Sequence, residues 1–288
     1  MLRPPCTLRR LFAALPAAAF LCLALLPGCY SFNYMQAPVY VPRPSYGQAT
    51  LGLQASAAGS LSGFGQGAGQ FTVATRQGWI FGADVSAYSR SIRDCTQISP
   101  ALFSLGRPPD LISNYYARGF SVGALAGRAW HRQETTYMLT AGLAQEVQRR
   151  GVTVYDFLDE AQYRARNLSQ RVWLQGAMRA CLQGYDDPTE RQVYTLWALR
   201  LGHTLPDAFG ASNVSLTQGP HVPQDPYVLE QPGRRWLLSL LGGFEYRRRA
   251  WALGYQMQFN MALDSAQGWY RGPTLVHTVQ GNFVLPLR

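Results

Sequence analysis

The feature that most constrains the fold is a regular alternation of apolar and polar residues near the C-terminus. Between residues 251 and 261, one set of alternate positions holds Trp, Leu, Tyr, Met, Phe and Met, and the other holds Ala, Gly, Gln, Gln and Asn. Successive side chains of a β-strand point to opposite faces, whereas no face of an α-helix collects every second residue. The segment is therefore predicted to be a strand with one apolar and one polar face.

The same alternation recurs along the chain and predicts ten strands. They are long, mostly ten residues or more, whereas strands of soluble proteins usually have about five or six and a bilayer is crossed by about 9–11. The predicted strands are residues 48–57, 66–75, 78–89, 115–130, 134–147, 169–181, 190–203, 234–247, 250–263 and 273–286. Longer and shorter connections alternate, with long loops predicted at 148–168 and 204–233. The pattern predicts an all-β fold, an antiparallel up-and-down β-barrel with short turns at one end.

Two observations favour a membrane barrel. The polar faces hold Gly, Ala, Ser and Gln more than charged residues, and only 15% of the chain is charged, against about 25% in ordinary soluble domains. Several tryptophans lie near strand ends or on apolar faces, as in interfacial girdles: Trp79, Trp130, Trp197, Trp236 and Trp251. The alternative is a soluble β-barrel or sandwich, facing the periplasm, that packs its apolar face inward and binds a ligand or a protein partner.

The N-terminus has the features of an export signal. Arginines at positions 3, 9 and 10 precede an apolar core at 11–26, so residues 1–28 are predicted to be a signal peptide. The sequence Leu25-Leu26-Pro27-Gly28-Cys29 resembles the bacterial lipobox, and this resemblance implies cleavage before Cys29 and lipidation of that residue. Tyr30 follows, rather than the Asp that retains many Gram-negative lipoproteins in the inner membrane, which favours the outer membrane. The alternatives are a plain signal peptide with an incidental Cys and an uncleaved helix.

The chain is expected to have three parts. Residues 29–47 contain Pro38, Pro42 and Pro44 and are predicted to be an extended, lipidated tether, because prolines stiffen a linker. The signal peptide at 1–28 precedes this tether, and the β-barrel domain follows at 48–288.

The order of these features resembles that of Gram-negative outer-membrane lipoproteins with a porin-like β-barrel domain. Two segments carry the resemblance: Gln66-Gly-Ala-Gly-Gln70-Phe-Thr-Val, and Leu229-Glu230-Gln231-Pro232 before a long hairpin. The resemblance implies an outer-membrane location, contact with membrane lipid, and handling by the lipoprotein-processing and barrel-assembly machineries.

Other functional classes find little support. All 26 basic residues are Arg and they are scattered, so the net charge of +10 does not indicate a nucleic-acid partner. The four His show no paired metal-ligand spacing, and no nucleophile motif is present. We therefore expect no enzyme activity, no metal and no cofactor, while any small ligand remains unknown.

The candidate functional residues are charges on the polar faces. If the apolar faces meet lipid, these charges point into the lumen, and a ten-stranded lumen is narrow enough for side chains to fill. Paired charges would form a structural plug; the alternatives are a narrow, anion-preferring path or a small-ligand pocket, because Arg outnumbers acid. The candidate residues are Asp84, Glu146, Arg171, Arg179, Arg200, Glu245 and Arg247.

Overall fold

The structure is a computed structural model of the 288-residue chain. It describes residues 39, 41–45, 47–60, 64–93, 111–156, 159–183, 191–206, 213–218, 235–263 and 274–287. The predicted signal peptide, the lipobox and Cys29 lie outside the described residues. Within the described ranges, no helix is long and apolar enough to cross a membrane.

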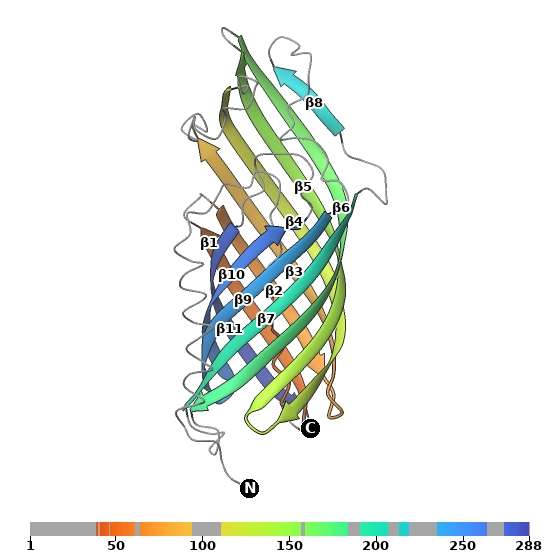
Figure 1. Cartoon of the computed structure of the whole chain (residues 1–288), viewed down its shortest axis with the longest axis vertical. Coiled ribbons are helices and arrows are strands. Elements are labelled where there is room, and N and C mark those ends of the chain that lie inside the picture. Colours follow the sequence, from red (N-terminus) through yellow and green to blue (C-terminus); the bar gives the residue numbers. More distant parts are fainter. Residues whose placement is uncertain are drawn as a thin grey trace.

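Ten strands pair in chain order and form a closed antiparallel barrel (Figure 1). The ring closes where the first strand pairs with the last, with Ala49 opposite Leu287. The predicted all-β, up-and-down barrel of about ten strands is therefore confirmed. The barrel strands are β1 (Ala49–Ser60), β2 (Phe64–Ala74), β3 (Trp79–Arg93), β4 (Leu111–Arg132), β5 (Thr135–Asp156), β6 (Asp159–Gln183), β7 (Arg191–Pro206), β9 (Arg235–Arg248), β10 (Trp251–Ala262) and β11 (Thr274–Leu287).

The prediction of a loop at 148–168 is wrong. Strand β5 pairs with β6 over its whole length, from Thr135 opposite Ala180 to Asp156 opposite Asp159, and with β4 as far as Leu111 opposite Tyr155, so this side of the wall rises above the other barrel strands (Figure 1). Alternation fades in this extension because neither face needs to be apolar there: Arg149 and Arg166 lie opposite each other and are both exposed.

The predicted loop at 204–233 also contains regular structure. Strand β8 (Asn213–Gln218) pairs with the extension of β6 and lies outside the closed ring. It is a short edge strand that broadens the wall above the barrel (Figure 1).

Tight turns gather at the barrel end where β1 begins and β11 ends. Gln133 and Arg249 adopt left-handed conformations, with φ of 53° and 54°, in the β4–β5 and β9–β10 turns. Gly78, with φ of 87°, closes the β2–β3 turn and accepts a 2.7 Å hydrogen bond from the Ala129 N–H. A Cβ at Gly78 would lie 2.5 Å from the Ala129 carbonyl oxygen, so both conformation and space require glycine.

Candidate functional site

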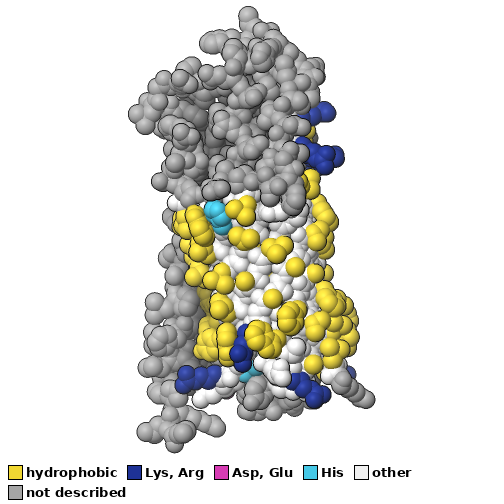
Figure 2. Space-filling view, turned by 90° about the vertical axis from the view of Figure 1, so that its right-hand side faces the viewer, with side chains coloured by type: hydrophobic (Ala, Val, Ile, Leu, Met, Phe, Trp, Pro, Cys, Tyr) yellow, Lys and Arg dark blue, Asp and Glu magenta, His cyan; other side chains and the backbone are white. Residues whose placement is uncertain are grey.

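The barrel wall is apolar outside and polar inside. On β10, Trp251 and Leu253 are 66% and 62% exposed, whereas Gln256 and Gln258 on the opposite face are each 2% exposed. On the face shown in Figure 2, apolar side chains are spread over the described part of the outer wall. A soluble barrel would have the reverse arrangement. The fold is therefore of the outer-membrane type, with an even number of strands, an apolar exterior and a polar lumen.

The structure places the seven candidate charges on the inner face of the wall. The side chain of Arg247 is partly buried and the other six are buried: Asp84, Glu146, Arg171, Arg179, Arg200 and Glu245. They do not form a single site, because they divide into groups at different heights of the lumen.

Glu245 is the centre of the group nearer the short turns. Its Oε1 accepts a 2.8 Å hydrogen bond from Arg179 Nη2, and its Oε2 accepts hydrogen bonds from Arg43 Nε and, at 3.2 Å, from Asn282 Nδ2. The carboxylate is completely buried. One acid thus holds two guanidinium groups, and the Arg179 guanidinium also lies 3.5 Å from the centre of the Tyr194 ring.

A second group surrounds Glu146 and Arg171, which form a buried ion pair between β5 and β6. The Tyr88 hydroxyl donates to the other carboxylate oxygen of Glu146. The structure therefore brings this acid and this base together on the inner face of the wall.

Two of the three remaining candidates, Arg200 and Arg247, have other partners. Arg200 donates to Gln175 Oε1 from Nε at 2.9 Å and from Nη2 at 2.7 Å. Its guanidinium also stacks 4.3 Å from the centre of the Trp173 ring. Arg247 donates from Nε to the Arg249 carbonyl oxygen at 2.9 Å and lines the short-turn mouth of the lumen.

An N-terminal segment inside the lumen is the principal feature that sequence reasoning missed. The described residues of 39–45 were predicted to belong to a tether separate from the barrel, yet Val39, Val41 and Arg43 are only 1%, 0% and 7% exposed. The Val39 N–H donates to Gln258 Oε1 at 2.8 Å, and Arg43 Nη1 donates to Gln54 Oε1 at 2.6 Å. The segment is therefore bound to side chains of β1, β9 and β10.

The composition of this segment suits a position inside the lumen, where no strand of the described barrel offers backbone hydrogen-bond partners. Pro42 and Pro44 are buried and carry no N–H group, so neither leaves an unpaired backbone donor there. Val39, Val41 and Arg43 occupy alternate positions. Pro42 and Pro44 are buried as well, so burial does not alternate along the segment and no period-two signal marks it in the sequence.

Several apolar residues of the wall face inward and belong to the same buried cluster as the two valines of the segment. A water-filled lumen would favour polar side chains, but Val39 and Val41 form one buried cluster with residues from β2 to β9 around the wall. Its other members are Ala74, Ile80, Leu125, Ala129, Met138, Trp173, Leu196, Ala198 and Leu241. These exceptions to the alternation are explained by the buried cluster that they form together with the two valines.

Glycines make room for the large inward aromatic side chains. Gly119 lies opposite Tyr88, and Gly142 lies opposite Trp173. A Cβ at Gly119 would be 2.2 Å from Tyr88 Cζ, and one at Gly142 would be 2.3 Å from Trp173 Cζ2. Both rings can lie flat against the wall only because these neighbours lack side chains.

Replacing Gly119 with Ala is expected to displace Tyr88 from Glu146 and to lower the free energy of unfolding by about 1–3 kcal/mol, the usual cost of overpacking. The measurement is the temperature at which the barrel unfolds in detergent, read from its gel migration. Gly176→Ala is the matched control, because nothing lies within 4 Å of a Cβ at that position. Equal losses in both variants would show that the Tyr88 contact is not responsible.

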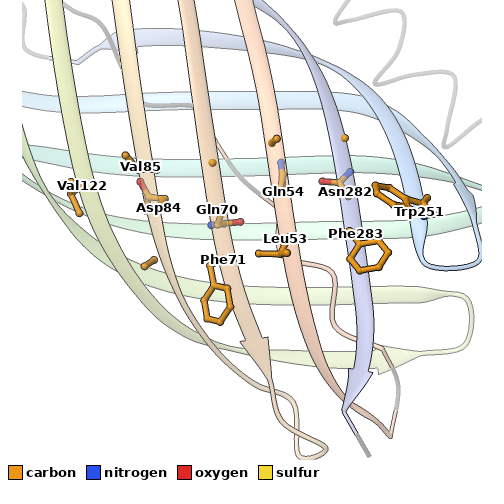
Figure 3. A pocket seen from close by; sticks show the side chains of 14 residues that line it. Leu53, Gln54, Gln70, Phe71, Asp84, Val85, Val122, Trp251, Asn282 and Phe283 are labelled. Atoms are coloured by element: carbon orange, nitrogen blue, oxygen red, sulfur yellow. The ribbon is translucent and has the colours of Figure 1, made fainter.

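Two hollows lie near the residues of the barrel wall described above. A polar pocket of about 270 Å³ opens at the short-turn mouth, lined by Pro44, Ser45, His131, Gln133, Glu134, Thr136, Arg179, Tyr194 and Arg247. An apolar groove of about 700 Å³ lies on the outer wall, where Leu53, Phe71, Trp251 and Phe283 flank small residues on neighbouring strands (Figure 3). The larger hollow therefore belongs to the outer surface and not to the lumen. No cluster of three or more metal-binding side chains occurs among the described residues.

Comparison of the sequence with protein-family models and with curated proteins finds no match. Among solved structures, the translocator domain of autotransporter NalP from Neisseria meningitidis aligns with a TM-score of 0.42 and 8% identity, over 84% of this chain and 88% of that one. The β domain of the Bordetella autotransporter BrkA aligns with a TM-score of 0.35 and 9% identity, over 84% of this chain and 100% of that one. The function is therefore inferred from the residues of this chain.

Proposed function

We propose that this chain is an outer-membrane β-barrel protein that spans the bilayer with its ten barrel strands and is also anchored by lipid on Cys29. The apolar exterior carries the proposal. Exposed apolar surface costs about 25 cal/mol per Å² in water, and in lipid that cost disappears. Closure of the ring pairs the strand edges, which a hydrocarbon environment requires. A soluble barrel with an apolar core is not favoured by this arrangement.

The short-turn end has the side chains expected at a membrane interface. Exposed aromatic residues near the turns form a girdle: Trp79, Trp130, Tyr137, Tyr246 and Trp251. The Arg128 guanidinium lies 5.3 Å from the centre of the Trp79 ring, and other exposed arginines follow at the rim, namely Arg76, Arg132, Arg191, Arg248 and Arg249. Aromatic rings at headgroup level, with cations facing phosphate, support a membrane boundary here.

The lumen favours a structural role over an open pore. Buried ion pairs and the described residues of 39–45 occupy the lumen, which supports a closed form. Binding of a small anion is a second candidate, supported by Arg179 and Arg247 at the mouth pocket. Under this proposal the partners are membrane lipid and the lipoprotein-processing and barrel-assembly machineries, and the protein is not an enzyme.

Gel migration tests the proposal directly. The unboiled protein, extracted in detergent, is expected to migrate faster than the boiled protein, because a closed transmembrane barrel stays folded in mild detergent. A signal-less Cys29→Ala protein should aggregate without detergent and recover the fast-migrating form with it. Solubility and a monomeric state without detergent would contradict membrane insertion. A mass increase that is lost in the exported Cys29→Ala variant would identify the lipid.

A further inference from the structure

We propose that residues 39–45 are a releasable plug, held by a guanidinium-binding site on the lumen wall, and that the barrel becomes an anion-preferring pore when the plug leaves. This inference rests on the proposed function, because a pore requires a barrel that spans a membrane. It goes further by assigning a closing element, a binding site for one chemical group, and a second, conducting state.

The binding site is built around the Arg43 side chain. Glu245 Oε2 accepts from Arg43 Nε, Gln54 Oε1 accepts from Nη1 at 2.6 Å, and the Val41 carbonyl oxygen accepts from the same nitrogen at 3.2 Å. The acceptors come from β9, from β1 and from the segment itself. Charged and directional acceptors around a planar guanidinium give both affinity and specificity for arginine.

Besides this ion pair, apolar packing and a backbone hydrogen bond bind the segment to the wall. Val39 and Val41 pack in the apolar cluster, and Gln258 on β10 binds the backbone of Val39. Gln258 lies well inside β10, whereas Ser45 lines the short-turn mouth, so the segment extends along the lumen rather than lying across its entrance. The contacts tie the segment to β1, β9 and β10, and the apolar cluster that contains its two valines includes residues from most of the other barrel strands.

The segment is nevertheless not part of the wall. Unlike the ten strands, residues 41–45 have no strand pairing, and the described contacts of the segment with the wall are made through side chains or to a single backbone N–H. Removing it leaves the closed ring of backbone hydrogen bonds intact. Glu245 would also keep its ion pair with Arg179. The barrel can therefore survive departure of the plug.

The emptied lumen would carry positive charge. On the described strands, five buried or partly buried arginines (150, 171, 179, 200 and 247) face three acids (Asp84, Glu146 and Glu245), a net charge of +2. The side-chain N–H groups of Gln66, Gln70, Gln256 and Gln280 are buried and find no protein acceptor within the described residues. A lumen with excess cations and hydrogen-bond donors prefers anions.

The test compares full-length wild type, Arg43→Ala and Arg43→Lys by planar-bilayer recording, with Arg76→Ala in an exposed turn as the control. Wild type and control should be closed nearly all the time. Arg43→Ala should raise the open fraction by roughly 10–100-fold, since it breaks a buried charge pair, and the open current should prefer chloride over potassium. Arg43→Lys should fall between them, because an ammonium matches one acceptor rather than the planar set. Val41→Asp, which places a charge in the apolar cluster instead of breaking the ion pair, should also raise the open fraction.

Chemical rescue tests the guanidinium site itself. Millimolar methylguanidinium should reclose Arg43→Ala, should not reclose Arg43→Ala combined with Glu245→Gln, and methylammonium should be less effective. An Arg43→Ala barrel that inserts but remains as closed as wild type, or a cation-selective current, would overturn the inference.

A second measurement needs no bilayer. In a protein without other cysteines, a Val41→Cys side chain should react only slowly with maleimide in detergent. Adding Arg43→Ala should increase this labelling rate at least about tenfold, because the rate is proportional to the fraction of open barrels. Equal labelling rates would overturn the plug regardless of insertion. Loss of the fast-migrating folded form in wild type would instead refute the proposed membrane barrel, so the two failures can be distinguished.

Discussion

Glu245→Gln is expected to lose about 3–5 kcal/mol of stability, because removing one partner of a buried ion pair leaves an uncompensated charge. The substitution conserves shape and creates no cavity. It leaves the Arg43 and Arg179 guanidinium groups, both of which bind this carboxylate, facing a neutral amide. The measurement is the temperature at which the fast-migrating folded form converts to the unfolded one in detergent. We expect a large decrease relative to wild type.

Arg43→Met is the informative comparison for this prediction. It removes one guanidinium but leaves the Arg179–Glu245 pair complete, so its loss of stability should be clearly smaller than that of Glu245→Gln. The ranking follows from the geometry, in which one acid is shared by two bases. If the two variants unfold at the same temperature as wild type, water in the lumen must already solvate these charges, and the ion pairs would not stabilise the barrel.

The fold could be predicted from the sequence because a barrel with an apolar exterior and a polar interior imposes a strong pattern. Each wall strand needs an apolar face outside and a polar face inside, so the period-two signal of segments such as residues 251–261 is regular and long. The extension of β5 and β6 was missed for the same reason. Residues such as Arg149 and Arg166 face water, and the physical constraint that creates the pattern no longer acts on them.

The lumen was less predictable. Alternation assigns Glu245 and Arg179 to the inner face, but it cannot say which charges meet, because Arg179 on β6 reaches past β7 to Glu245 on β9. Arg43 was missed entirely, since its role depends on a segment that has no regular secondary structure at residues 41–45 and therefore no hydrophobic period. Inward apolar residues such as Leu196 and Leu241 interrupt the polar faces of their strands, and in the structure they belong to the buried cluster that includes Val39 and Val41.

Leu143→Arg provides the sharpest test of whether the outer wall meets lipid. Leu143 lies on β5 and is 62% exposed, between the girdle residue Tyr137 and the exposed Arg149 further along the same strand. This position is well inside the apolar band. An arginine near the middle of a bilayer destabilises a transmembrane barrel by about 2–4 kcal/mol, whereas an exposed substitution in water usually changes stability by less than about 0.5 kcal/mol. We therefore expect a large loss of folding free energy in lipid vesicles.

Two comparisons separate the effect of lipid from that of the side chain itself. Leu143→Ala removes the leucine without adding a charge, so in vesicles it should lose much less stability than Leu143→Arg. In a detergent micelle, where the polar boundary can deform around one guanidinium, the difference between the two variants should shrink. A soluble barrel predicts instead that Leu143→Arg is tolerated in water and that vesicles make no difference. Because only contact with hydrocarbon makes the same arginine costly in vesicles and tolerable elsewhere, the vesicle-to-micelle difference measures the environment of the outer wall directly.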